Sequence, residues 1–328
     1  MRDFSYVRPE GAAEAVRLVA RDADATFVAG GTDLLNLMKD GAEDHSLVVD
    51  VSRLPLAGIE ESRGRLRIGA MARMADVALH PVVRKRLPVL SQALLASASP
   101  QVRTMATIGG NLLQRTRCWY FRGTDFACNK REPGSGCAAL EGRSRWHAVL
   151  GGGDHCIAVH PSDLAVSLRA LDATVHTLGP DGARTVSLAD FYREPGDTPH
   201  IDNALRHGEL ITAVEVPLPP AGTHQRYLKL RDRATFEFAV VSVAAVLRTR
   251  GRVVEEARLA FGGIATRPWR SAEAEDALRG KPLTERNIAA AGRVLVRDAQ
   301  PREDNEFKVE LVQRALQDVL GRYTGGSR

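Results

Sequence analysis

ATFVAGGTDLLNLM, residues 25–38, joins a strand pattern to a helix pattern through a pair of glycines. The apolar run 25–29 predicts a short buried strand, and 34–38 predicts the first turns of a helix. Gly30 and Gly31 let the backbone turn sharply and approach a ligand closely, because neither carries a Cβ atom. The N–H groups at the start of the helix could then bind a phosphate. The same pattern also fits an ordinary strand-to-helix turn.

The segments around this stretch continue the alternation of helices and strands. The same patterns predict a helix over 9–20, strands over 46–51 and 66–70, helices near 73–80 and 84–98, a helix over 162–171, and a hairpin of 173–178 with 184–188. Strands that alternate with helices of this length predict α/β layers.

A Pro-rich boundary at 217–222 separates this region from a second one. Beyond it the sequence predicts three strands, over 225–230, 238–248 and 252–261, and then helices, the last over 305–320. Strands followed by helices predict an antiparallel sheet with helices on one face. The predicted fold class is therefore α+β, with one domain at 1–220, built from two α/β subdomains, and another at 221–328. The tail at 324–328 is expected to fray.

A second glycine pair, Gly109-Gly110, lies between Thr107 and Asn111. Two such turns could hold a pyrophosphate from both sides. Farther along, Asp163 begins a predicted helix. Its carboxylate could simply cap that helix, or it could accept hydrogen bonds from ribityl or ribose hydroxyls.

Charge and hydropathy exclude several classes of protein. The 45 Lys and Arg against 40 Asp and Glu give a net charge of +5, but the basic residues are scattered and aromatic residues make up only 5%, so nucleic-acid binding is not predicted. The longest apolar stretch, 238–247, is too short to span a membrane. The first residues form no apolar signal core, and we expect no secretory signal on this chain. The histidines show no catalytic spacing, and no catalytic residue is predicted.

The four cysteines, Cys118, Cys128, Cys137 and Cys156, all lie in one segment without clear periodicity, 115–156. Their spacing is C-x9-C, C-x8-C and C-x18-C. Zinc sites usually contain CxxC pairs, which are absent here, whereas four thiolates match the requirement of one [4Fe–4S] cluster. The many cations between 115 and 145 would stabilise such an anionic cluster. A loop stapled by zinc or by disulfides remains an alternative.

Several stretches of sequence, spread over the whole chain, are similar to those of a known protein family. They are VAGGTDLL at 28–35, ATIGGNLLQRTRC at 106–118, CNKREPGSGCAALEG at 128–142, HCIAVHPSDLAV at 155–166 and KLRDRATFEFAVVSVAA at 229–245. The chain resembles the FAD-binding medium subunit of the xanthine dehydrogenase and molybdenum aldehyde oxidoreductase family. The cysteine segment resembles the insertion of a subgroup with an extra [4Fe–4S] cluster, and bacterial periplasmic aldehyde oxidoreductases match best.

The resemblance implies a PCMH-type FAD-binding domain followed by a C-terminal α+β domain. It implies that the FAD pyrophosphate is wrapped by Phe27, Val28, Ala29, Gly30, Gly31, Thr32, Asp33 and Leu34. A second wall would come from Thr107, Gly109, Gly110 and Asn111. Asp163 would bind the ribityl chain, and Lys229 would reach the flavin from the C-terminal domain. The cluster ligands would be Cys118, Cys128, Cys137 and Cys156.

The function implied is electron transfer from iron–sulfur clusters through FAD to an external acceptor. The partners would be a large molybdenum-cofactor subunit and a small [2Fe–2S] subunit, in a heterotrimer or its dimer. The location would be cytoplasmic, or periplasmic if a partner with a Tat signal carries the chain across. The alternatives are a flavin subunit like that of 4-hydroxybenzoyl-CoA reductase, a flavoenzyme that oxidises its own substrate, and a zinc-stapled nucleotide-binding or scaffold protein without a redox role.

Overall fold

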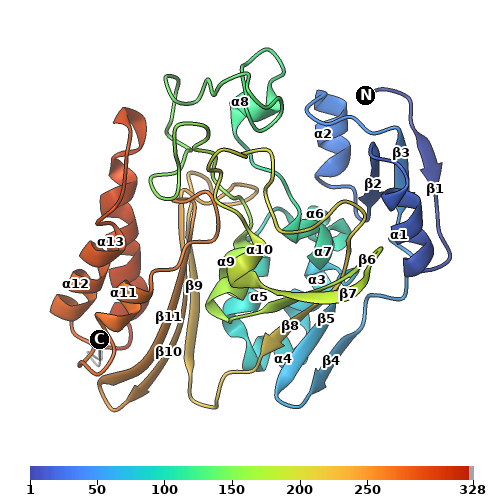
Figure 1. Ribbon diagram of the computed structural model, residues 1–328. Coiled ribbons are helices and arrows are strands. Elements are labelled where there is room, and N and C mark those ends of the chain that lie inside the picture. Colours follow the sequence, from blue (N-terminus) through green and yellow to red (C-terminus); the bar gives the residue numbers. More distant parts are fainter. Residues whose placement is uncertain (325–328) are drawn as a thin grey trace.

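The computed structural model describes residues 1–324, and the rest of the expected fraying tail lies outside the described residues. Three sheets form three lobes that stand side by side (Figure 1). The cysteine segment runs across the top of the molecule in this view, between the first and third lobes. The expected α+β fold class is confirmed.

The first lobe is a small α/β unit. Its elements are β1 (Ser5–Val7), α1 (Ala12–Ala20), β2 (Ala25–Val28), α2 (Leu34–Asp40) and β3 (Leu47–Asp50). The strands are parallel in the order β1-β3-β2. Parallel neighbours need a helical crossover, which α1 and α2 supply. The turn at Gly30 and Gly31 therefore lies at the carboxyl end of β2, where open α/β sheets bind ligands.

The second lobe has a five-stranded antiparallel sheet. Its strands, in spatial order, are β4 (Ile59–Ser62), β5 (Arg65–Gly69), β8 (Leu210–Pro217), β6 (Thr174–Gly179) and β7 (Gly182–Ser187). Its helices are α3 (Met74–Leu79), α4 (Pro81–Arg86), α5 (Pro88–Ala96), α6 (Pro100–Met105), α7 (Ile108–Leu112), α9 (Asp163–Ala170) and α10 (Leu188–Phe191). The single helix expected near 84–98 is divided because Pro88 cannot donate a backbone hydrogen bond inside a helix and begins a new one.

The third lobe is an antiparallel sheet covered by helices. It contains β9 (His224–Leu230), β10 (Val241–Arg250), β11 (Val253–Gly262), α11 (Ala272–Asp276), α12 (Glu285–Leu295), a 3₁₀ turn (Glu303–Asn305) and α13 (Phe307–Gly321). The central strand β10 is buried on both faces. Val241, Val243 and Leu247 pack in the core with α12 and α13, whereas Ala244 and Val246 belong to the core of the second lobe. The sheet of the third lobe thus lies between the helices of its own lobe on one face and α5 and α9 of the second lobe on the other.

The cysteine segment contains one short helix, α8 (Trp119–Arg122), and is otherwise irregular. An isolated bridge pairs Cys128 with Cys137, and another pairs Gly153 with Cys156. The expectation of a long segment without periodic structure is confirmed.

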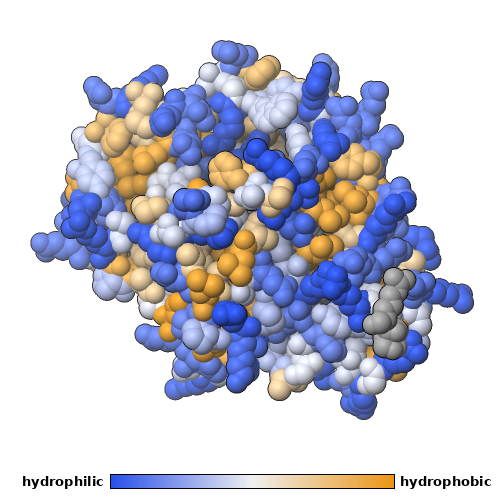
Figure 2. All heavy atoms as spheres, turned by 180° about the vertical axis from the view of Figure 1, so that it is seen from behind, coloured by the Kyte–Doolittle hydropathy of each residue, from blue (hydrophilic) through white to orange (hydrophobic). Residues whose placement is uncertain are grey.

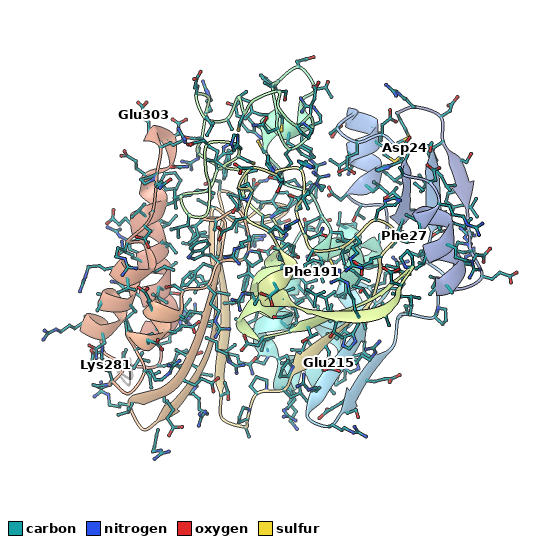
Figure 3. The ribbon with its side chains drawn as sticks, viewed as in Figure 1. Asp24, Phe27, Phe191, Glu215, Lys281 and Glu303 are labelled. Atoms are coloured by element: carbon teal, nitrogen blue, oxygen red, sulfur yellow. The ribbon has the colours of Figure 1, made fainter. Side chains whose placement is uncertain are left out.

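Figure 3 shows the side chains on this framework, among them Phe191, which is fully buried in the second lobe. On the rear face, hydrophobic residues form several separate patches among hydrophilic ones (Figure 2). Among the helices of residues 1–324, none has both the length and the apolar character required to cross a bilayer.

Candidate functional site

A cavity of about 680 Å³ lies between the first and second lobes. Both glycine turns line it, and the loop between β9 and β10 contributes Arg233, Phe236, Glu237 and Phe238 to its wall. Two of the three lobes and a loop of the third therefore build one site, although their residues are far apart in the sequence.

The first glycine turn follows β2 and packs directly against the end of α6. A Cβ atom on Gly30 would overlap the carbonyl oxygen of Met105, so no larger residue fits without moving the backbone. Gly31 has a φ of 68°, a left-handed conformation that favours glycine. In the described part of the chain, the N–H groups of Gly30, Gly31, Thr32 and Asp33 donate to no protein acceptor. Four open donors therefore line the cavity in succession.

The second glycine turn uses its donors within the protein. Thr107 caps α7 by accepting from the N–H of Gly110 at 3.2 Å. The N–H groups of Ile108 and Gly109 donate to the carbonyl oxygens of Ala72 and Ala70, at 3.0 and 2.8 Å. This turn lines the cavity, but its N–H groups are hydrogen-bonded to Ala70, Ala72 and Thr107. It therefore contributes surface to the cavity and no open N–H donors.

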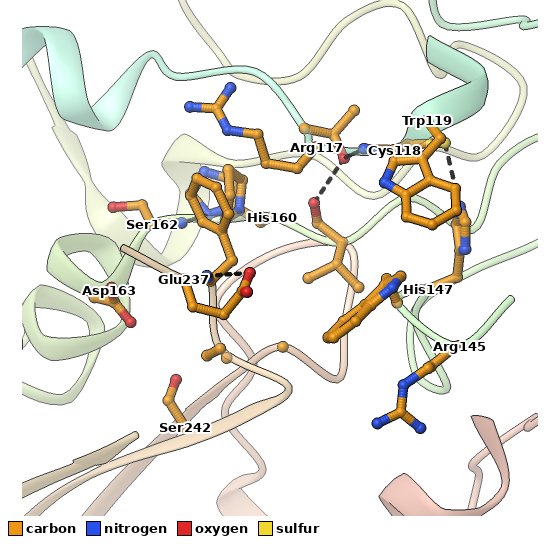
Figure 4. Close-up of a pocket in the computed structure, with 18 of the residues that line it drawn as sticks. Arg117, Cys118, Trp119, Arg145, His147, His160, Ser162, Asp163, Glu237 and Ser242 are labelled. Atoms are coloured by element: carbon orange, nitrogen blue, oxygen red, sulfur yellow. Dashed lines mark hydrogen bonds between the residues drawn. The ribbon is translucent and has the colours of Figure 1, made fainter. Parts of the chain in front are cut away.

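A smaller cavity of about 420 Å³ adjoins the first one. The two share Arg117, Pro161, Asp163, Glu237 and Phe238 as lining residues. Figure 4 shows Asp163, Ser162 and Ser242 on one side of it, and Cys118, Trp119 and His147 on the other.

Three buried polar atoms on the wall of the smaller cavity have no hydrogen-bond partner among the described residues. They are Nδ1 of His147, Nε2 of His160 and Oγ of Ser242. Burial lowers the pKa of both histidines to about 4, so both imidazoles are neutral near pH 7. An unpaired buried polar atom is costly, and these three are the unsatisfied side-chain atoms of the residues that line this cavity.

Asp163 lies where the two cavities meet, and its carboxylate is fixed by two residues of β9 and by Ser97 at the end of α5. Tyr227 donates to Oδ1 at 2.5 Å, while Lys229 and Ser97 donate to Oδ2 at 2.8 and 3.0 Å. The cap of α9 is Ser162, which accepts from the N–H of Ala165, so Asp163 is not needed as a cap. Proximity to this carboxylate and burial hold the pKa of Tyr227 well above its ordinary value.

The four cysteines converge on one small pocket under the cysteine segment. All four are free thiols. Within residues 1–324 no group of three or more Cys, His, Asp or Glu side chains is close enough to hold a single metal ion. Four ligands of one zinc ion would have to lie within about 4 Å of one another, whereas a cluster takes each cysteine on a different iron and needs a wider arrangement.

The surroundings of the thiols combine burial with hydrogen-bond donors. Burial raises the pKa of Cys118 to about 12 and that of Cys156 to about 11, and it also raises the pKa of Cys137. The N–H of Ala158 donates to Sγ of Cys156 at 3.4 Å, and Nε2 of His147 lies 3.2 Å from Sγ of Cys118. Backbone donors of this kind are typical of iron–sulfur sites, where they stabilise anionic sulfur.

The arginines of the cysteine segment are directed at carboxylates of the other lobes. Asp33 accepts from the side chains of Arg117 and Arg122 and, at 2.8 Å, from the backbone N–H of Arg115. The Arg115 guanidinium pairs with Glu43 and Asp202. The prediction that cations of this segment stabilise an anionic cluster stays a prediction, and the structure adds that Arg115, Arg117 and Arg122 pair with carboxylates. Lys130, whose charge lowers the pKa of Cys156, also pairs with Asp202.

Comparison with protein families accounts for nearly the whole chain. A model described as the FAD binding domain in molybdopterin dehydrogenase matches residues 2–219. The chain belongs to the molybdopterin dehydrogenase flavoproteins. A second model, the CO dehydrogenase flavoprotein C-terminal domain, matches residues 226–323.

Relatives of this flavoprotein are named as subunits of oxidoreductases. The aldehyde oxidoreductase FAD-binding subunit PaoB of Escherichia coli (strain K12) is 50% identical over 322 residues, which cover 98% of either chain. The carbon monoxide dehydrogenase medium chain of Hydrogenophaga pseudoflava is 29% identical, over 97% of this chain and 98% of that one. A solved structure of carbon monoxide dehydrogenase from the same organism, lacking the Mo-pyranopterin moiety, matches with a TM-score of 0.77 and 28% identity over 98% of this chain and 96% of that one.

The structure brings most of the predicted cofactor-binding residues of the flavoprotein together. The larger cavity is lined by all of Phe27, Val28, Ala29, Gly30, Gly31, Thr32, Asp33 and Leu34, and also by Thr107, Gly109, Gly110, Asn111 and Asp163. Lys229 differs, because it lines neither cavity. Its ammonium group donates to Oδ2 of Asp163, so it contacts the cavity wall only through that carboxylate.

Several residues of the site were not predicted from the sequence. Tyr227 and Ser97 hold Asp163, and Phe238 lines both cavities. One usable signal was present: Tyr227 and Lys229 are two residues apart on a strand, and side chains at this spacing point to the same face. For Ser97 the sequence holds no comparable signal.

Proposed function

We propose that this chain is the electron-transfer flavin subunit of a heteromeric molybdenum hydroxylase of the aldehyde oxidoreductase type. FAD would lie across the two connected cavities, with its diphosphate on the first glycine turn. When bound, FAD accepts electrons singly and can deliver them in pairs to an external acceptor. The organic substrate would be oxidised on a partner subunit.

The row of four open N–H donors at Gly30–Asp33 carries this proposal. The first N–H groups of a helix have no acceptor within that helix, so the turn before α2 leaves a run of donors that a bound anion can use. A diphosphate supplies several anionic oxygens in a row, and the start of α2 adds a favourable dipole. The 50% identity with an aldehyde oxidoreductase subunit supports that type of complex over the other members of the family.

The remaining lining residues would position the two ends of the cofactor. The carboxylate of Asp163 retains acceptor capacity beyond its three donors, because each of its oxygens can accept two hydrogen bonds. It would orient a ribityl hydroxyl. In the smaller cavity, Phe238 would contribute an apolar surface for the flavin ring.

The proposal includes a [4Fe–4S] cluster held by Cys118, Cys128, Cys137 and Cys156. Their shared pocket and the backbone donor to Sγ of Cys156 support this part of the proposal. Cys118 also lines the smaller cavity, which would place the cluster beside the flavin ring. Metal binding would ionise the thiols, and the raised pKa values of Cys118, Cys137 and Cys156 keep these three protonated otherwise.

The proposed partners are a large molybdenum-cofactor subunit and a small [2Fe–2S] subunit, in a heterotrimer or its dimer. Several relatives are named as medium chains or FAD-binding subunits, which supports such a complex. We place the complex in the cytoplasm, or in the periplasm if a partner carries a Tat signal. Co-purification with the tagged chain, followed by fractionation of cells, tests both points.

An absorption spectrum of the anaerobically purified chain tests the cofactor assignment. We expect flavin bands on a broad iron–sulfur absorption that bleaches with dithionite, and about four irons for each flavin. A colourless protein that contains zinc would contradict the proposal. The isolated chain should oxidise no aldehyde, and substrate turnover without partner subunits would favour a flavoenzyme that acts alone.

A further inference from the structure

We propose that Arg117 and Arg122 are positioning residues for the flavin, because they turn the Asp33 carboxylate away from the open donors of the first glycine turn. This inference rests on the proposed function, since it takes the FAD diphosphate as the ligand of those donors. It assigns to the cysteine segment a role in flavin binding that needs no iron.

Asp33 stands in an unusual position for a carboxylate. It directly precedes α2, where an aspartate would commonly cap the helix, but its side chain makes no capping hydrogen bond. Both of its oxygens are instead bound to the cysteine segment: Oδ1 to Arg117 and Arg122, and Oδ2 to the N–H of Arg115. Its own N–H is one of the four open donors.

The electrostatic reason for the pairing follows from this position. An unpaired carboxylate beside the donors would repel a diphosphate, and the Asp33 side chain is only 15% exposed, so water would screen that repulsion weakly. Two guanidinium groups more than offset this single negative charge and fix the direction of the carboxylate. Burial raises the pKa of Asp33, while attraction by Arg122 opposes that rise and favours the charged form.

The cysteine segment itself holds the two arginines in place. Nε of Arg122 donates to the carbonyl of Thr116 at 3.1 Å, and Nη1 of Arg117 donates to the carbonyl of Arg115 at 3.1 Å. The Arg117 guanidinium also lies 4.8 Å from the centre of the Phe238 ring. Their geometry is thus set before any ligand binds, whereas Arg115 is engaged by Glu43 and Asp202.

Flavin affinity of the full-length apo chain tests the inference. In the double variant R117M/R122M we expect the Kd for FAD, measured by quenching of flavin fluorescence, to rise at least about tenfold. Adding D33N should restore the Kd to within about threefold of wild type, because it removes the uncompensated charge. The exposed Arg53→Met is the matched control and should leave the Kd unchanged.

The rescue separates positioning from a direct or purely structural role. If the arginines bound the diphosphate themselves, or only supported the fold, D33N would not restore affinity, and the inference would be wrong. It would be equally wrong if R117M/R122M bound FAD as wild type does. Should R117M/R122M fail to fold, D33N alone decides: we expect it to bind FAD at least as tightly as wild type, and weaker binding would overturn the inference. A wild-type chain that binds no FAD would instead refute the proposed function.

Discussion

The two glycine turns look alike in the sequence and differ in the structure. Both pair two glycines with small polar residues, and both line the larger cavity. The turn at Gly30 leaves its N–H groups open, whereas the turn at Gly109 gives its N–H groups to Ala70, Ala72 and Thr107. Similar motifs therefore have different tasks, because a donor can bind a ligand only if the fold does not already use it. We expect the first turn to govern flavin affinity and the second to govern stability.

Gly30→Ala should give the largest effect on flavin binding. Its Cβ atom would overlap the carbonyl oxygen of Met105, so the turn must move and its donors must lose their alignment. We expect the Kd for FAD to rise about 100-fold or more. Gly11→Ala is the control, since no atom lies within 4 Å of the added Cβ. A Kd for FAD close to that of wild type would contradict the assignment of the first turn to the flavin-binding site.

Gly109→Ala should act mainly on stability. The added Cβ would lie 3.0 Å from Cβ of Ala70 and 3.2 Å from its carbonyl oxygen, a tight contact that a small shift can relieve. We expect the free energy of unfolding to fall by about 1–3 kcal/mol. Urea denaturation measures this, and flavin titration should show a much smaller change than for Gly30→Ala. Loss of flavin without loss of stability would break the comparison.

Thr107→Ala removes the cap of α7 and should cost about 1 kcal/mol. Thr284→Ala is a matched control, because Thr284 caps α12 in the same way in the third lobe. Both variants should lower the urea midpoint to a similar degree. A flavin defect in Thr107→Ala as large as that of Gly30→Ala would show that the second turn binds the diphosphate as strongly as the first.

Cys137→Ser should have the smallest effect on flavin. The substitution removes one proposed cluster ligand, and we expect the iron to be lost. Both glycine turns and Asp33 lie outside the pocket of Cys137, so the Kd for FAD should stay within about twofold of wild type. Iron and flavin analyses of the same preparation measure both. Unchanged iron content would contradict the ligand assignment, and joint loss of iron and flavin would contradict their independence.

Local patterns in the sequence predict most helices and strands of this fold. The strand–turn–helix at 25–38, the hairpin of β6 and β7 and the sheet of β9, β10 and β11 all lie where the periodicity places them. Tertiary placement is harder to predict. No strand is predicted from the sequence over Leu210–Pro217, and nothing local indicates that β8 lies between β5 and β6 at the centre of its sheet.

The candidate site shows the same limit. Glycine pairs can be recognised in a sequence, but whether their N–H groups are open depends on which carbonyls other segments bring near. The partners of Asp33 follow it by more than 80 residues, and no local signal connects them. The convergence of the cysteines was predictable from their number and clustering, whereas the pairing of Arg115, Arg117 and Arg122 with carboxylates was not, because many anions could have balanced them.

The double burial of β10 also bears on how separable the parts of this chain are. The two family matches meet between residues 219 and 226, which suggests interchangeable modules. Alternate residues of β10, however, belong to two different hydrophobic cores. In addition, Lys229 and Tyr227 donate hydrogen bonds to the carboxylate of Asp163, which belongs to the region matched by the first family model. A chain cut at that seam would bare the apolar surfaces of α5 and α9 and leave Asp163 without two of its partners. The boundary between the two family matches is therefore not a place where the chain can be divided into two stable parts. Calorimetry of the intact chain should record one cooperative unfolding transition.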